Sequence, residues 1–163
     1  MGPYKWGPRS SRPSISTSMG GKAFHRQFSA EDFPRIPTPV YEKIKERLLK
    51  RLQLIYTRVG VPHEAPGKND HGDLDFLVVG PLGSINDVKN AIGATSSICL
   101  EGNRTSNFAV PVDHSEWEGV TDGCYYQVDI HVCADDDEWE RIFFYHSYGD
   151  LGELTAETWK MLI

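Results

Sequence analysis

Lys68-Asn69-Asp70-His71-Gly72-Asp73-Leu74-Asp75-Phe76-Leu77-Val78-Val79-Gly80 is the stretch that decides the fold, because two carboxylates stand where it turns apolar. Period-two alternation predicts a strand with Asp73, Asp75 and Leu77 on one face. The opposite face then carries Leu74, Phe76 and Val78. Side chains two residues apart on one face are separated by about 7 Å, so the carboxylates repel unless a cation, a proton or solvent intervenes. Asp-x-Asp alone also fits a strand end capped in water, and only a third acid would indicate a site.

Length and composition describe an ordinary soluble domain with one core: 163 residues, 39% hydrophobic and 25% charged. No apolar run approaches the roughly 20 residues that span a membrane. The net charge of -6 indicates that the domain as a whole does not coat phosphates. Cys99, Cys124 and Cys133 form no Cys-x-x-Cys pair, which favours reduced thiols and an intracellular, cytoplasmic location over a disulfide framework or a zinc site.

Charge is unevenly distributed along the chain. Residues 1–30 are rich in Gly, Pro and Ser and contain no acid, which predicts a disordered basic arm before a domain over 31–163. Such a start also resembles an organelle transit peptide, so mitochondrial targeting stays open, although the early Gly and Pro residues spoil an amphipathic helix. Ten acids and no Lys or Arg lie between Asp113 and Glu140. That acidic stretch repels phosphates unless a divalent cation neutralises it.

Periodicity predicts the other elements of the domain. Apolar residues four apart (Val40, Ile44, Leu48 and Leu52) predict a helix that Thr38 caps and Pro39 begins. A short helix over 85–92 has Ser84 as its cap and ends at Gly93. The expected strands cover 53–59, 73–79, 96–100, 107–112 and 125–133, with a loop at 61–71. A further helix starts at 135–137, and its pattern resumes after Gly149.

Asp129 is the third acid, in the middle of the strand predicted over 125–133, with Gln127 and His131 on its own face. A carboxylate within so apolar a strand is unfavourable unless it is paired or bound to metal. If the two acidic strands are neighbours with their acidic faces aligned, Asp73, Asp75 and Asp129 converge. Two unit charges about 4 Å apart repel by about 4 kcal/mol at an effective dielectric constant of about 20. A pair of Mg²⁺ ions about 3.5–4 Å apart would relieve this repulsion and suit in-line displacement at phosphorus.

This ordered set resembles the DNA polymerase β-like nucleotidyltransferase superfamily. The matching parts are the helix from Pro39, the strand ending Val59-Gly60-Val61, the loop 62–72, Asp73-Leu74-Asp75 and Gln127-Val128-Asp129-Ile130. Within this superfamily, the sequence most resembles an uncharacterised, fungal-type branch in two places, residues 68–75 and Tyr148-Gly149-Asp150-Leu151-Gly152. The resemblance implies an α/β (α+β) minimal nucleotidyltransferase fold, a mixed β-sheet flanked by helices.

The resemblance also implies a reaction, in which a nucleoside monophosphate passes from a nucleoside triphosphate such as ATP to a hydroxyl, with Mg²⁺ or Mn²⁺ as cofactor. Asp73, Asp75 and Asp129 would be the metal ligands, and Asp129 would activate the acceptor hydroxyl. Gly60, Val61, Lys68 and Gly72 correspond to the nucleotide-binding positions. Val61 replaces the family's serine, so Lys68 or backbone amides near Gly67 and Gly72 would hold the triphosphate.

Family members usually continue into helices that hold the base, whereas this sequence ends at Ile163. A protein partner or a missing C-terminal segment is therefore expected to complete the pocket. The acceptor is open among protein, RNA, tRNA and small molecules, and the acidic surface disfavours long nucleic acid.

Three other interpretations of the same residues stay open. One is a catalytically inactive nucleotidyltransferase-like binding module, which Val61 and the early end of the sequence favour. A second is a metal-dependent phosphohydrolase with a mixed site of His71, His131, Asp73 and Asp129. In the third, the aromatic residues of the last predicted helices, such as Trp139 and Phe143, stack on bases instead of packing a core. A P-loop is excluded, because Pro62 stands where its first Gly is required.

Overall fold

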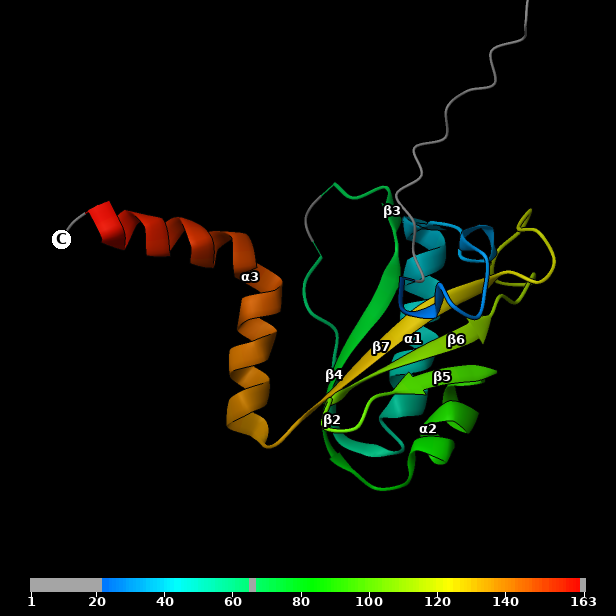
Figure 1. The fold of residues 1–163 in the computed structure, drawn as a ribbon, viewed down its shortest axis with the longest axis horizontal. Helices are drawn as coiled ribbons and strands as arrows, with labels where there is room; N and C mark the ends of the chain where they lie inside the picture. The colour runs from blue at the N-terminus through cyan, green and yellow to red at the C-terminus, as the bar shows by residue number, and fades with distance from the viewer. Residues whose placement is uncertain (1–21, 65–66, 162–163) are drawn as a thin grey trace, which may run out of the picture.

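A computed structural model describes residues 22–64 and 67–161, which form an α+β fold around a five-stranded mixed sheet (Figure 1). The strand order is β2-β4-β7-β6-β5. Their bounds are β2 Tyr56–Gly60, β4 Asp73–Pro81, β5 Ser96–Cys99, β6 Thr105–Pro111 and β7 Tyr125–Cys133. The pairing of β4 with β7 is parallel, and the other neighbours in the sheet are antiparallel. A two-stranded sheet pairs β1 (Ile36–Pro37) with β3 (Asp70–His71). The predicted mixed sheet with flanking helices is confirmed.

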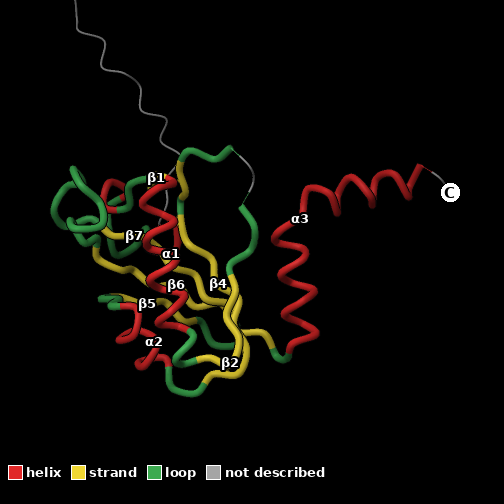
Figure 2. The backbone as a smooth tube through the Cα atoms, turned by 180° about the vertical axis from the view of Figure 1, so that it is seen from behind, coloured by secondary structure: helices red, strands yellow, loops and turns green. Residues whose placement is uncertain are grey.

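Two helices cover one face of the sheet, α1 (Thr38–Leu52) and α2 (Ile85–Ile92); α1 crosses in front of the strands in Figure 2. The stripe of α1 that faces the sheet is buried and consists of Tyr41, Ile44, Leu48 and Leu52. It packs against the apolar face of β4, where Leu74, Phe76 and Val78 are buried as the alternation predicts. The acids of β4 therefore belong to the opposite face.

Some of the predicted ends of helices and strands are confirmed and others are wrong. Ser84 caps α2, with its hydroxyl accepting a hydrogen bond from the Asp87 amide, and Gly93 ends the helix in the left-handed conformation at φ +74°. Thr38 does not cap α1, because Pro37 occupies the cap position and the Thr38 hydroxyl donates to the Lys68 carbonyl instead. The strand expected from residue 53 begins only at Tyr56, since the amide of Gln53 still bonds to the Leu49 carbonyl at the end of α1.

The long helix α3 (Asp136–Met161) covers part of the other face. Trp139 packs there with Leu77, Val79 and Cys133, and its indole Nε1 donates to the Leu77 carbonyl at 3.0 Å. The Arg58 guanidinium lies 3.7 Å from the centre of the Trp139 ring. At Tyr148 the backbone leaves helical geometry, and beyond this kink the helix projects away from the sheet (Figure 1). Among the described residues, no helix combines the length and apolarity needed to cross a bilayer.

Part of the expected arm packs on the domain. Residues 1–21 lie outside the described residues. From Lys22 onward the chain forms short 3-10 turns, η1 (Lys22–Phe24) and η2 (Ala30–Asp32). Phe24 is fully buried, in a cluster with Phe33 and Ala109 of β6. The packed chain therefore begins before the boundary expected at residue 31, because a few phenylalanines bury a segment that is otherwise polar.

Candidate functional site

The two acidic strands are neighbours, which is the condition for Asp73, Asp75 and Asp129 to converge. In the parallel pairing of β4 with β7, Asp75 lies opposite Asp129 and Asp73 lies opposite Gln127. Neighbouring strands are about 4.8 Å apart, and paired residues point to the same face. The three acids therefore share one region of the sheet face that α1 and α2 leave uncovered.

Asp75 lies in an unfavourable electrostatic environment. Burial, and after it the negative charges of Asp73, Asp129 and Glu64, raise the pKa of its carboxyl from 3.8 to about 7. The Lys68 ammonium acts in the opposite direction. Near neutral pH, Asp75 thus carries a charge that its surroundings oppose, which is the condition that a bound cation would relieve.

Asp129 is held by two amides. Asn107, its partner across β6 and β7, donates to Oδ1 at 2.7 Å. The Gln127 Nε2 donates to Oδ1 at 2.8 Å and to Oδ2 at 2.9 Å. Burial raises the pKa of Asp129 to about 6; the Asn107 and Gln127 hydrogen bonds oppose this increase, and the charge of Asp73 adds to it. A carboxylate with a pKa near neutrality, in a fixed orientation, suits proton transfer.

A small hollow of about 100 Å³ adjoins these carboxylates. Asp75 and Asp129 line it together with Thr105, His131 and His146 of α3. The Thr105 hydroxyl lies 2.9 Å from His131 Nδ1, which fixes the plane of the imidazole. His146 belongs to α3, which follows both acidic strands in the chain. Its place depends on how α3 docks, which local sequence does not reveal.

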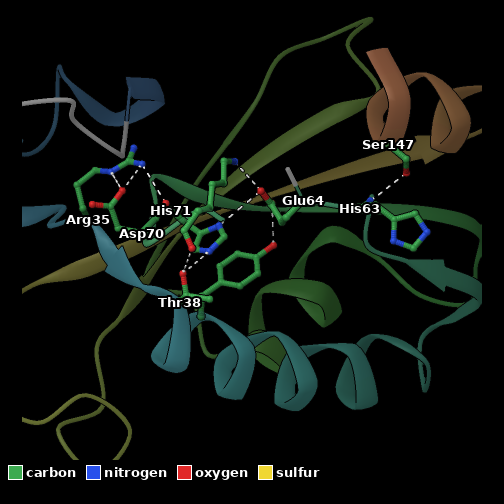
Figure 3. Close-up of polar contacts among 9 residues, drawn as sticks. Arg35, Thr38, His63, Glu64, Asp70, His71 and Ser147 are labelled. Carbon is green, nitrogen blue, oxygen red and sulfur yellow. Dashed lines mark hydrogen bonds and ion pairs between the residues drawn. The ribbon is translucent and has the colours of Figure 1, made fainter. Parts of the chain in front are cut away.

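The loop before β4 is tied to α1 through Glu64 and His71 (Figure 3). Glu64 accepts hydrogen bonds from the Tyr41 hydroxyl at 3.1 Å and from Lys68 Nζ at 2.5 Å. His71 is buried, stacks on Tyr41 with ring centres 3.8 Å apart, and its Nε2 lies 3.1 Å from the Thr38 hydroxyl. Its Nδ1 is 3.5 Å from a Glu64 oxygen. The bond to Glu64 therefore holds the Lys68 ammonium in place, close enough to Asp75 to lower the pKa of that carboxyl.

The predicted nucleotide-binding positions are only partly brought together. Trp139 covers Gly60: a Cβ atom added there would lie 2.3 Å from the Trp139 Cζ2. Val61 packs against the main core and lines a groove of about 490 Å³ along α1, away from the acids. Gly72 lies between β3 and β4, directly before Asp73. His71 is engaged by Tyr41 and Thr38, so the mixed site of His71 and His131 with the acids is not assembled.

The donor chemistry of the acids fits a hard divalent cation, because carboxylate oxygens are the ligands that Mg²⁺ prefers. In the part of the chain that the structure describes, however, no three His, Cys, Asp or Glu side chains are arranged to hold a metal ion as they stand. The acids are neighbours whose charges repel, and ligation of one ion by all three would require their side chains to move.

Sequence reasoning missed Asn107, as well as Thr105 and His146. The signal available for Asn107 was a lone amide at the start of an apolar run, which has meaning only once β6 is paired with β7. Searches for similar proteins add nothing to this geometry: neither a protein-family model nor a curated protein matches the sequence. The chemistry of the site is therefore the basis on which a function is proposed.

Proposed function

We propose that this chain is a nucleotidyltransferase domain of the DNA polymerase β-like kind, which transfers a nucleoside monophosphate from a nucleoside triphosphate to a hydroxyl. The observation that carries the proposal is the parallel pairing of β4 with β7, which sets Asp75 beside Asp129 and next to Asp73. The raised pKa of Asp75, caused by burial and by the other two acids, supports a site made for a cation.

Asp73 and Asp75 would hold Mg²⁺ or Mn²⁺, with Asp129 as the third ligand. When bound, the metal neutralises phosphate charge and makes the acceptor hydroxyl more acidic. Lys68 lies near enough to Asp75 to influence its pKa, so its ammonium can also face the triphosphate in place of the donor that Val61 lacks.

Asp129 would act as the general base of the reaction. Its carboxylate accepts the proton of the acceptor hydroxyl, whose oxygen forms a bond to the α-phosphorus. The bond from the α-phosphorus to the oxygen that bridges it to the β-phosphate breaks, and pyrophosphate leaves. Asn107 and Gln127 keep the Asp129 oxygens oriented while the proton moves.

Labelled-nucleotide transfer tests the proposal. The wild type is incubated with each labelled NTP and Mg²⁺ or Mn²⁺, with protein, RNA and small-molecule hydroxyl acceptors, beside Asp75→Asn and Asp129→Asn. We expect transfer by the wild type and a loss of at least about 100-fold in both variants, as for other electrostatic catalytic groups. Asp137→Asn, at an exposed acid of α3, is the matched control. A wild type inactive with every nucleotide, metal and acceptor would overturn the assignment.

A catalytically inactive binding module is the second candidate, and the covering of Gly60 by Trp139 favours it. The orientation of Val61 toward the core points the same way. Equilibrium binding of a non-hydrolysable nucleotide in the same preparations separates the two functions: saturable, Asp75-dependent binding without transfer would identify the module. Release of inorganic phosphate without any transferred nucleotide would identify a phosphohydrolase instead.

A further inference from the structure

Gln127 connects the Asp129 carboxylate to the N-terminal part of the described chain. Its side-chain nitrogen donates to both Asp129 oxygens, at 2.8 and 2.9 Å. Its side-chain oxygen accepts a hydrogen bond from the Ala23 amide at 3.3 Å. Gln127 is only 3% exposed, so solvent competes little for these bonds. A shift of the Ala23 amide would therefore move the Gln127 side chain, and with it the donor that orients the Asp129 carboxylate.

Residues 22–33, here called the N-terminal segment, are anchored independently of Gln127. Phe24 stacks on Phe33 with ring centres 5.6 Å apart, and Phe28 lies 4.8 Å from the ring of Tyr125 on β7. Gln27 also accepts a hydrogen bond from the Ser96 hydroxyl of β5 at 2.8 Å. These contacts fix the Ala23 amide relative to β7.

The direction of these bonds selects one orientation of the Gln127 amide. A glutamine amide has a donor end and an acceptor end that a half-turn exchanges. The Ala23 amide can only donate and an ionised Asp129 can only accept, so both neighbours favour the same orientation. In the reverse orientation an amide oxygen would face the carboxylate, and a buried N–H would face another N–H, which is unfavourable at both ends.

We propose that Gln127 is a positioning residue for Asp129 and that the N-terminal segment, through the Ala23 amide, is part of this site. The segment thereby controls the orientation of a carboxylate on β7 without touching substrate. The catalytic consequence rests on the proposed function, whereas the contact itself does not.

A backbone substitution tests the contact without altering Gln127. Ala23→Pro removes the N–H that donates to Gln127, and the fixed φ of proline suits a 3-10 turn. Ala30→Pro is the matched control, because it also lies in a 3-10 turn of this segment and its N–H makes no hydrogen bond among the described residues. The readout is the hydrogen exchange of the Gln127 side-chain amide by NMR. We expect slow exchange in the wild type and Ala30→Pro, and clearly faster exchange in Ala23→Pro. Equal exchange in all three would overturn the proposal.

Gln127→Met tests the catalytic consequence, since methionine keeps the length of the side chain and removes its hydrogen bonds. We expect kcat for nucleotide transfer to fall by about 10- to 100-fold, the usual effect of losing a residue that orients a catalytic group. KM for the nucleotide should change little, which a general loss of folding would not produce. Ala23→Pro, which leaves the core side chains intact, should lower kcat in the same direction. Unchanged kcat in both variants would overturn the positioning role.

The two proposals fail separately. A wild type without transfer activity contradicts the nucleotidyltransferase assignment, and the exchange of the Gln127 amide still decides whether the N-terminal segment orients it. Conversely, an active wild type in which Ala23→Pro changes neither exchange nor kcat keeps the assignment and removes the segment from the site.

Discussion

Asp75 is the residue at which stability and the proposed function oppose each other. A core residue selected for stability would not combine burial with two neighbouring acids. Burial and these neighbours raise the pKa of Asp75 from 3.8 to about 7 in the folded chain. Because the folded pKa is raised, the contribution of the carboxyl to stability is fully present below the unfolded pKa of 3.8 and is lost progressively as the pH rises from there through about 7.

Asp75→Asn should therefore stabilise the metal-free protein at pH 8, and by less than half as much at pH 5, which lies only about one unit above the ordinary pKa of 3.8. The gain has an upper bound of about 4 kcal/mol, at about 1.4 kcal/mol for each unit of pKa. Urea denaturation in the presence of a chelator, at both pH values, measures it. Asp137→Asn, at an exposed acid, should show no such dependence. An equal effect of Asp75→Asn at pH 5 and pH 8 would contradict the assigned pKa.

At the scale of elements, the contact between β2 and α3 gives Gly60 a structural role besides any role with nucleotide. The Trp139 ring lies where a side chain at residue 60 would be, and Arg58 of the same strand stacks on that ring. Arg58 also pairs with Asp136 and Glu140 of the helix. The strand thus holds the first turns of α3 against the sheet.

Gly60→Ala should destabilise the fold, because its Cβ would lie 2.3 Å from the Trp139 ring and the helix must move. Overpacking of this kind costs about 1–3 kcal/mol. The double variant Gly60→Ala/Trp139→Leu should be more stable than the sum of the single effects predicts, since the smaller side chain makes room. Denaturant titration of the four proteins tests this, and strict additivity would refute the contact.

Elements with strong local periodicity could be predicted from the sequence. The stripe of α1, the alternation of β4 and the end of α2 at Gly93 all follow from residues a few positions apart. What could not be predicted depends on pairing between distant segments. Asn107 reaches Asp129 only through the register of β6 with β7, and Thr38 bonds to the Lys68 carbonyl of a distant loop instead of capping its own helix.

In the whole molecule, folding brings together negative charges that are separated in the sequence. The chain carries a net charge of -6, and the sheet face with Asp73, Asp75 and Asp129 gathers acids from strands far apart in sequence. A cation bound there would stabilise the folded chain, because the unfolded chain keeps Asp129 apart from Asp73 and Asp75.

Mg²⁺ should raise the melting temperature of the wild type. At 100 times the dissociation constant a ligand specific for the folded state adds about 2.7 kcal/mol, or several degrees for a domain of this size. Differential scanning fluorimetry, with KCl at matched ionic strength as the control, measures the shift. The shift should disappear in Asp75→Asn. An identical shift with KCl would show that general screening is responsible.

The parallel pairing of β4 with β7 also has a kinetic consequence. The intervening chain runs through α2, β5 and β6, so this pairing closes a long loop and depends on non-local contacts, which form slowly. Repulsion between Asp75 and Asp129 arises only when the loop closes, and it therefore opposes the late stage of folding. We expect Asp75→Asn to refold faster than the wild type in chelator at pH 8, as measured by stopped-flow fluorescence. A change confined to the unfolding rate would mean that the strands pair after the transition state.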